Sequence, residues 1–138
     1  MTRQQMIDLV NKYFTGVDGE DISTIKETLT PDCIFSVETH CVELQGYGQI
    51  EKMFKRLWAN HDTVKHHKFI YVPCPDEGRI AVRFQVDNTL LDRQMVHKSN
   101  CNFFEVKGDK FERVAVYMTG HNTLDKEYAL VIELAGCV

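Results

Sequence analysis

Three runs of alternating residues follow one another within positions 79–119, with only turn-length gaps between them. Alternation of this kind places successive side chains on opposite faces of a strand. A short glycine-containing link at 107–109 joins the second run to the third, which is typical of a β-hairpin. The pattern therefore predicts an antiparallel sheet of locally paired strands in this part of the chain.

One face of this predicted sheet carries amides that a solid core would normally exclude. A buried amide without a hydrogen-bond partner costs roughly 1–3 kcal/mol. The amides therefore pair with each other or with backbone near strand ends, or they line a cavity in which a ligand carbonyl or hydroxyl bonds to them. We interpret the face as the wall of a ligand pocket, with these candidate binding residues: Phe84, Val86, Asn88, Asn100, Val116 and Met118, beside Asn102 and Phe104.

Helical patterns precede the sheet. Apolar residues from Met6 to Val17 recur at spacings of three and four, which predicts a helix to about Thr15. Asp21 is a candidate N-cap for a second helix, and that helix is expected to end before Pro31 because the residue preceding a proline disfavours helical geometry.

A third helix is predicted to open at Gly46, after short strands at 33–38 and 41–45, and to end in a polar turn at 60–63. Phe54 and Trp58 lie on its apolar side. These two rings are candidates to close over a ring-shaped ligand, although their helical spacing is more typical of a core stripe.

Size and composition fit one globular domain spanning residues 1–138. The chain is 43% hydrophobic and 26% charged, which are ordinary values for a globular protein. Its formal charge is -4, and its basic residues are scattered rather than striped. This charge distribution favours neither nucleic acid nor an anionic membrane as a partner.

The sequence also leads to an expectation about compartment. The first residues, MTRQQMIDLV, lack the apolar core and cleavage site of a signal peptide, and no apolar run is long enough to span a bilayer. Five cysteines form an odd set without a C-x-x-C pair, which favours reduced thiols. We expect a cytoplasmic protein without disulfides.

Several short motifs, taken in order, resemble the nuclear-transport-factor-two-like superfamily, which includes ketosteroid isomerase, scytalone dehydratase and the SnoaL-type polyketide cyclases. They are KYF at 12–14, GEDI at 19–22, LTPD at 29–32, Gly46, GDKF at 108–111 and VYM at 116–118. The resemblance covers residues 1–124 and leaves 125–138 as a C-terminal extension.

The resemblance implies a cone-shaped α+β roll, in which a strongly curved, mostly antiparallel sheet wraps around three N-terminal helices. It also implies a ligand cavity in the open mouth of the cone and a homodimer formed through the outer face of the sheet. Because this fold hosts isomerases, dehydratases, hydrolases and binding proteins, it does not choose among those activities.

Carried over residue by residue, the resemblance assigns candidate catalytic roles. Tyr13 matches the oxyanion-hole tyrosine of ketosteroid isomerase and Asn102 its second hydrogen-bond donor, whereas the general base of that family falls on Val37. Asp18 matches an acidic residue of scytalone dehydratase, and His67 lies near its first catalytic histidine. These matches assign Tyr13 and Asn102 to oxyanion stabilisation, and His67 or Asp18 to proton transfer.

Thr119 stands where SnoaL-type cyclases carry an aspartate, so no complete catalytic set is transferred. The leading hypothesis is binding of a small hydrophobic, oxygenated ligand, with a cofactor-independent isomerase, dehydratase or cyclase reaction. The alternative is a non-catalytic ligand-binding or dimeric assembly module of the same fold. No metal is expected, because the histidines at 61, 66 and 67 show no recognised ligand spacing.

Overall fold

The computed structural model of the chain describes residues 1–120. Its elements are three helices, six strands and two short 3-10 turns. In chain order they are α1 (Arg3–Asp18), α2 (Ile22–Thr28), β1 (Leu29–Val37), η1 (Glu38–His40), β2 (Val42–Gln45), α3 (Gly46–Asn60), β3 (His61–Cys74), η2 (Pro75–Glu77), β4 (Arg79–Leu90), β5 (Met95–Lys107) and β6 (Lys110–Tyr117).

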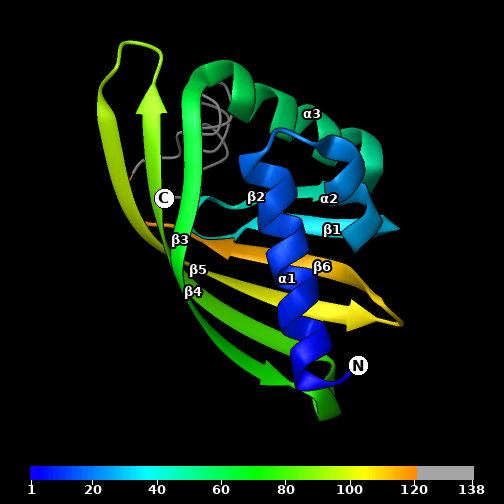
Figure 1. Cartoon of the computed structure of the whole chain (residues 1–138). Helices are drawn as coiled ribbons and strands as arrows, with labels where there is room; N and C mark the ends of the chain where they lie inside the picture. The colour runs from blue at the N-terminus through cyan, green and yellow to red at the C-terminus, as the bar shows by residue number, and fades with distance from the viewer. Residues whose placement is uncertain (121–138) are drawn as a thin grey trace.

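The strands form a single open sheet in the order β2-β1-β6-β5-β4-β3. Only the β1–β6 pair is parallel within the described residues, and the other neighbouring pairs are antiparallel. Figure 1 shows the sheet curving around the helices, with α1 crossing one face. The predicted fold class, an α+β roll with a mostly antiparallel sheet, is confirmed.

Helix α1 extends one turn beyond its predicted end. Thr2 caps its first turn, since its side chain accepts from the backbone N–H of Gln5 and its own N–H donates to the Gln5 side chain. Gly16 is a residue of this helix, and α2 packs closely against it. A Cβ at this position would lie 2.8 Å from Cγ1 of Ile25, which explains why a glycine is needed here. The additional turn carries Asp18 toward β3.

The junctions around α2 and α3 are partly as predicted. Asp21 caps α2 by accepting from the backbone N–H of Thr24 at 3.2 Å. The turn expected at 60–63 is wrong, because β3 begins at His61, directly after α3. The buried His61 ring stabilises this direct junction between α3 and β3, because its Nδ1 donates to the carbonyl oxygen of Leu57 at 2.7 Å.

Strand β3 contains a bulge at Lys68. The pairing with β4 passes from His67 opposite Gln85 to Ile70 opposite Arg83, so three steps along β3 match two steps along β4. Lys68 has a φ of 55°, in the left-handed region. An extra residue of this kind reverses the inward and outward alternation of side chains beyond it.

The bulge decides which of two consecutive histidines faces the helices. His66 and Phe69 both pack against Phe14 of α1, with ring-centroid distances of 4.8 and 5.1 Å. His67 lies on the opposite face of the strand, beside Asp87 of β4. The sequence pattern alone cannot separate the two histidines without knowing where the bulge lies.

The expectation of reduced thiols throughout is wrong. Cys41 is disulfide-bonded, whereas Cys33, Cys74 and Cys101 are free; Cys137 lies outside the described residues. Disulfide formation depends on which cysteines the fold brings within reach, and sequence spacing does not determine this. None of the helices in residues 1–120 combines the length and apolar composition needed to cross a bilayer.

Candidate functional site

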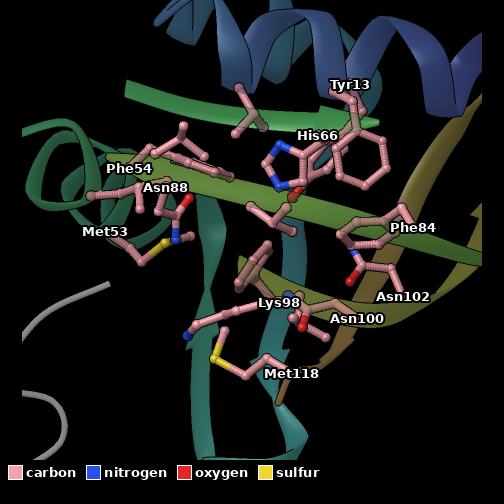
Figure 2. A pocket seen from close by; sticks show the side chains of 17 residues that line it. Tyr13, Met53, Phe54, His66, Phe84, Asn88, Lys98, Asn100, Asn102 and Met118 are labelled. Atoms are coloured by element: carbon pink, nitrogen blue, oxygen red, sulfur yellow. The ribbon is translucent and has the colours of Figure 1, made fainter. Parts of the chain in front are cut away.

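A cavity of about 60 Å³ lies between α1, α3 and the inner face of the sheet. Figure 2 shows its lining side chains converging from the helices and the strands. The lining consists of Tyr13, Phe14, Val17, Phe35, Met53, Phe54, Leu57, Val64, His66, Phe84, Val86, Asn88, Lys98, Asn100, Asn102, Val116 and Met118.

One side of the cavity is apolar and the other carries a row of polar side chains. The polar row comes from β4 and β5, where alternate residues point inward. Asn88, Asn100 and Asn102 are 4%, 7% and 2% exposed, so the prediction that these amides face inward is confirmed. Lys98 belongs to the same row and is 7% exposed.

The amides differ in their hydrogen bonds. The Asn100 side-chain oxygen accepts from the backbone N–H of Thr119 at 3.1 Å, which is a structural role near a strand end. The Oδ1 atom of Asn102 is buried without a hydrogen-bond partner among residues 1–120. Because an unsatisfied buried oxygen costs roughly 1–3 kcal/mol, Asn102 is the amide best placed to bind a ligand group.

Tyr13 projects from α1 into the same cavity (Figure 2) and is 2% exposed. Its ring makes edge contacts with Phe14 and Phe104, at centroid distances of 5.0 and 5.5 Å. Burial raises the pKa of the Tyr13 hydroxyl above its usual value, and the nearby Cys33 and Asp18 act in the same direction. The raised pKa keeps the Tyr13 hydroxyl protonated, so it is able to donate a hydrogen bond.

Asp18 and His66 form a hydrogen-bonded pair, of which His66 lines the cavity. Nδ1 of His66 lies 2.5 Å from Oδ1 of Asp18, and the backbone N–H of His66 donates to Oδ2 at 2.9 Å. The side chains of His66 and Asp18 are 11% and 26% exposed. The contact joins the last turn of α1 to the edge strand β3, across 48 positions of sequence.

This geometry fixes how His66 can act. A carboxylate only accepts hydrogen bonds, so Nδ1 of His66 is the donor to Asp18. In the neutral ring the proton is then on Nδ1, and Nε2 carries a free lone pair. A histidine that is oriented by a carboxylate and lines a cavity has the arrangement of a general base.

His67, the sequence-based candidate for proton transfer, does not line this cavity. Its Nε2 lies 2.9 Å from Oδ2 of Asp87, on the outer face of the sheet, where His97 donates to Oδ1 of Asp87 at 2.6 Å. The hydrogen bond from His97, together with the nearby His67, lowers the pKa of Asp87. The bulge at Lys68 explains the difference, since it turns His66 inward instead.

The three clustered histidines have separate partners. His61 bonds to the Leu57 carbonyl, His66 to Asp18, and His67 lies beside Asp87. Burial lowers the pKa of His61. Across residues 1–120 no group of three or more histidine, cysteine, aspartate or glutamate side chains is arranged to hold a metal ion.

The other sequence-based candidates divide as follows. Phe54, Phe84, Val86, Val116 and Met118 line the cavity together with Tyr13 and the asparagines. Trp58 does not line it: its ring stacks on Phe54 at 5.8 Å, and its Nε1–H donates to the Val17 carbonyl at 3.0 Å. Trp58 therefore connects α3 to α1 and packs behind the cavity.

Sequence reasoning missed two polar residues of the lining, His66 and Lys98. Strand alternation could have identified Lys98, because it has the same parity as Asn100 and Asn102. Desolvation by burial lowers the pKa of Lys98 to about 8. No local pattern distinguishes His66 from His67.

Comparison with known proteins agrees with this architecture. Residues 10–114 match the SnoaL-like domain family. No curated protein matches the chain. A candidate polyketide cyclase from Xanthomonas campestris pv. campestris has a similar structure, with a TM-score of 0.78, 15% identity, and 94% of this chain and 98% of that chain covered.

Two further solved structures share the fold. A Catenulispora acidiphila protein with a ketosteroid isomerase-like fold has a TM-score of 0.72 at 10% identity, covering 79% of this chain and 83% of that chain. A candidate isomerase from Bacillus subtilis has a TM-score of 0.73 at 13% identity, covering 84% and 87%. The family match extends over most of the described residues, and the chain therefore belongs to the SnoaL-like domain family.

Proposed function

We propose that the cavity binds a small, mostly apolar ligand carrying a hydroxyl or carbonyl oxygen, and that the protein acts on it as a cofactor-independent isomerase, dehydratase or cyclase. His66 moves the proton, and Asp18 orients His66. Tyr13 and Asn102 hold the ligand oxygen. The observation that carries this proposal is the hydrogen bond from His66 to Asp18, since His66 lines a cavity that also holds buried amides.

The reaction would proceed in two coupled parts. Tyr13 donates a hydrogen bond to the ligand oxygen and stabilises the negative charge that develops there. Nε2 of His66 removes a proton from the adjacent carbon and returns it at the position that defines the product. Asp18 stabilises the imidazolium that forms in between. Every proton taken from the ligand is given back, so no external acid or oxidant is consumed.

The size of the cavity favours a compact ligand. At about 60 Å³ it is less than half the volume of an engineered cavity of roughly 150 Å³ that binds benzene. Met53 and Met118 both line it, and methionine side chains adapt easily because they have three rotatable bonds. A single ring would therefore enter with movement of these two side chains. Of the three rings that could fill the cavity, Phe84 lines it, whereas Phe104 and Trp58 do not.

Binding of phenol tests the role of Asn102. Phenol should raise the melting temperature of the protein because it binds the folded state. In Asn102→Leu we expect phenol to bind about tenfold more weakly, since one hydrogen bond of about 1.4 kcal/mol is lost. The effect of toluene, which has the same ring without the hydroxyl, should be unchanged. Gln85→Leu, on the outer face, is the matched control.

An unchanged response of Asn102→Leu to phenol would remove Asn102 from the binding site. Loss of both the phenol and the toluene responses would show that the variant has closed the cavity. In that case Asn102→Asp separates a lost hydrogen bond from a closed cavity. Aspartate keeps the shape of the side chain and retains an oxygen that accepts a hydrogen bond from the phenol hydroxyl, so this variant should keep the phenol response.

The second candidate function is a non-catalytic binding module. The residue that favours it is Val37, on which the resemblance to ketosteroid isomerase places the general base. Val37 is 1% exposed, and a valine side chain cannot take a proton. A binding module would hold phenol as described but would show no proton transfer dependent on Asp18.

We also propose that a second copy of the chain covers the outer face of the sheet. Cross-strand neighbours place Phe103 between Ala81 and Ala115, with Tyr117 beside Cys101 in the next row. Phe103 and Tyr117 are 38% and 42% exposed. An apolar patch of this kind is self-complementary without needing opposite charges, which suits a twofold interface.

Sedimentation over a dilution series tests this pairing. The wild-type chain should sediment as a dimer that dissociates on dilution, and Phe103→Glu should sediment as a folded monomer, because each copy would bring an unpaired carboxylate into the interface. A wild-type chain that is monomeric at every concentration would contradict the proposal.

A further inference from the structure

A second pocket lies beside the cavity, with which it shares Val17 and Val64. It has a volume of about 80 Å³ and lies where the last turn of α1, the end of α3 and the start of β3 meet (Figure 1). One water-sized group needs roughly 10–15 Å³, so the pocket has room for several. Its lining consists of Val17, Asp18, Glu20, Trp58, His61, Asp62, Thr63 and Val64.

His61 contributes a buried ring nitrogen to this region. The residue is 4% exposed, and its Nε2 atom has no hydrogen-bond partner within residues 1–120. Nδ1 donates to the Leu57 carbonyl of α3, so Nε2, on the other side of the ring, is turned away from that helix. Of the two hollows, the described lining includes His61 only in the second. A donor bound in this pocket would satisfy Nε2.

The protonation of the His61 ring makes Nε2 an acceptor. A carbonyl oxygen only accepts, so the proton of the neutral ring is on Nδ1, and Nε2 keeps a lone pair. Burial lowers the pKa of His61, and Lys98, which lines the cavity, acts in the same direction. The ring is therefore neutral at pH 7 and presents an acceptor.

The acidic side chains of the described lining are acceptors as well. The ionised carboxylates of Asp18, Glu20 and Asp62 accept hydrogen bonds and cannot donate them. The Thr63 hydroxyl can do both. A set in which acceptors and negative charge predominate favours a cationic ligand that donates hydrogen bonds.

Two of these carboxylates have partners within the fold. Asp18 accepts from the ring and the backbone of His66, and Asp62 lies 3.0 Å from the exposed Arg93 guanidinium. Each carboxylate oxygen has two lone pairs, so both residues can accept a further bond. Across residues 1–120 no three histidine, cysteine or acidic side chains are arranged to hold a metal ion. An ammonium group, which bonds at the longer distance of about 2.7–3.2 Å, suits this spacing better.

We propose that this second pocket binds a short primary alkylammonium ion. The three N–H groups of the ammonium donate to Nε2 of His61 and to the carboxylates of Asp18 and Glu20. The alkyl group lies against Val17 and Val64. The site is separate from the proposed ligand cavity, and the two can be occupied independently.

Titration with ethylammonium chloride, followed by proton–nitrogen NMR, tests the site. The chain has one tryptophan, so the indole N–H of Trp58 gives a single signal from the lining. We expect saturable shifts of this signal and of Nε2 of His61, and no shift of the exposed His97 on the outer face. Sodium chloride at the same ionic strength corrects for screening.

Two further probes separate the hydrogen bonds from charge and from size. Tetramethylammonium carries the charge without an N–H group, and ethanol carries the alkyl group without the charge. Both should bind at least about tenfold more weakly than ethylammonium, because neither makes the charge-assisted hydrogen bonds. Equal affinity for tetramethylammonium would indicate unspecific attraction, and equal affinity for ethanol would indicate a pocket for any small polar molecule. Either result would overturn the proposal.

Two variants test the assigned acceptors. In His61→Asn the amide nitrogen can replace Nδ1 toward Leu57 while Nε2 is lost, so ethylammonium should bind about tenfold more weakly. Glu20→Gln, at an exposed position, should weaken binding about two- to fivefold. Glu112→Gln, exposed on β6 and outside the lining, is the matched control and should bind as the wild type does.

Unchanged affinity in Glu20→Gln and in a folded His61→Asn would contradict the assignment, as would the absence of any saturable shift in the wild-type protein. If His61→Asn does not fold, the result for Glu20→Gln decides. Phenol reports on Asn102 in the cavity and ethylammonium on Trp58 in the second pocket, so failure of this inference and failure of the proposed function are distinguishable.

Discussion

Asp18→Asn is expected to slow the protein-catalysed exchange of the α-protons of cyclohexanone with D₂O by about 10²–10⁴-fold. The exchange requires removal of a proton next to a carbonyl, which is the step assigned to His66. An asparagine amide can donate to Nδ1 of His66, while its oxygen still accepts from the His66 backbone. The ring proton then moves to Nε2, and the base is lost. NMR measures the exchange rate after subtraction of the buffer rate.

The neighbouring histidine provides the control for this experiment. His67→Gln alters the outer face of the sheet beside Asp87 and should change the exchange rate less than about twofold, because surface substitutions away from the site have small effects. Nitrogen-15 NMR should detect the Nδ1–H tautomer of His66 in the wild-type protein and the Nε2–H tautomer in Asp18→Asn. Equal exchange rates in wild type and Asp18→Asn would exclude His66 as the base.

Phe104→Ala is expected to lower the free energy of unfolding by about 3–5 kcal/mol. Phe104 is fully buried and contacts the rings of Tyr13 and Phe111, at centroid distances of 5.5 and 4.5 Å. Alanine would leave a cavity beneath Tyr13 and remove most of these contacts. Urea unfolding followed by circular dichroism measures the loss. Since the total free energy of unfolding of a domain of this size is only about 5–15 kcal/mol, the variant should be close to unfolding.

Phe104→Leu is the graded control. Leucine keeps most of the apolar volume of the side chain. Phe104→Leu should therefore lower the free energy of unfolding by about 1–2 kcal/mol, clearly less than Phe104→Ala does. The leucine variant should also keep the phenol response, because Tyr13 remains supported. Equal losses for the two variants would indicate that the site relaxes around any smaller side chain, and that Phe104 does not hold Tyr13 in place.

The layout of the sheet could be predicted because its signal is local. Alternation along β4 placed Ile80, Val82 and Phe84 on one face, and all three are buried. The same alternation predicted the inward direction of Asn88 and Asn102. Helix α3 opened at Gly46 as expected, although its junction with β3 is tighter than the polar residues after it indicated.

Assignment of the proton-transfer residue required structure. Phe69 faces inward, and in a regular strand the residue two positions before it, His67, would face inward as well. The extra residue at Lys68 shifts the alternation, so that His66 faces inward instead. The partner of His66 is Asp18, 48 positions away, and no periodic pattern relates the two. Lys98 has the parity of an inward residue, but its charge makes an exposed position the ordinary expectation.

The most direct test of ligand binding in this cavity is a phenol titration of the wild-type protein, followed by proton–nitrogen NMR of the side chains. We expect saturable shifts of the Asn102 side-chain amide and of the His66 ring nitrogens, and no shifts of Gln85 and His97 on the outer face. Shifts confined to the outer face, or no shift at Asn102 and His66 at saturating phenol, would contradict the claim that this cavity is the binding site.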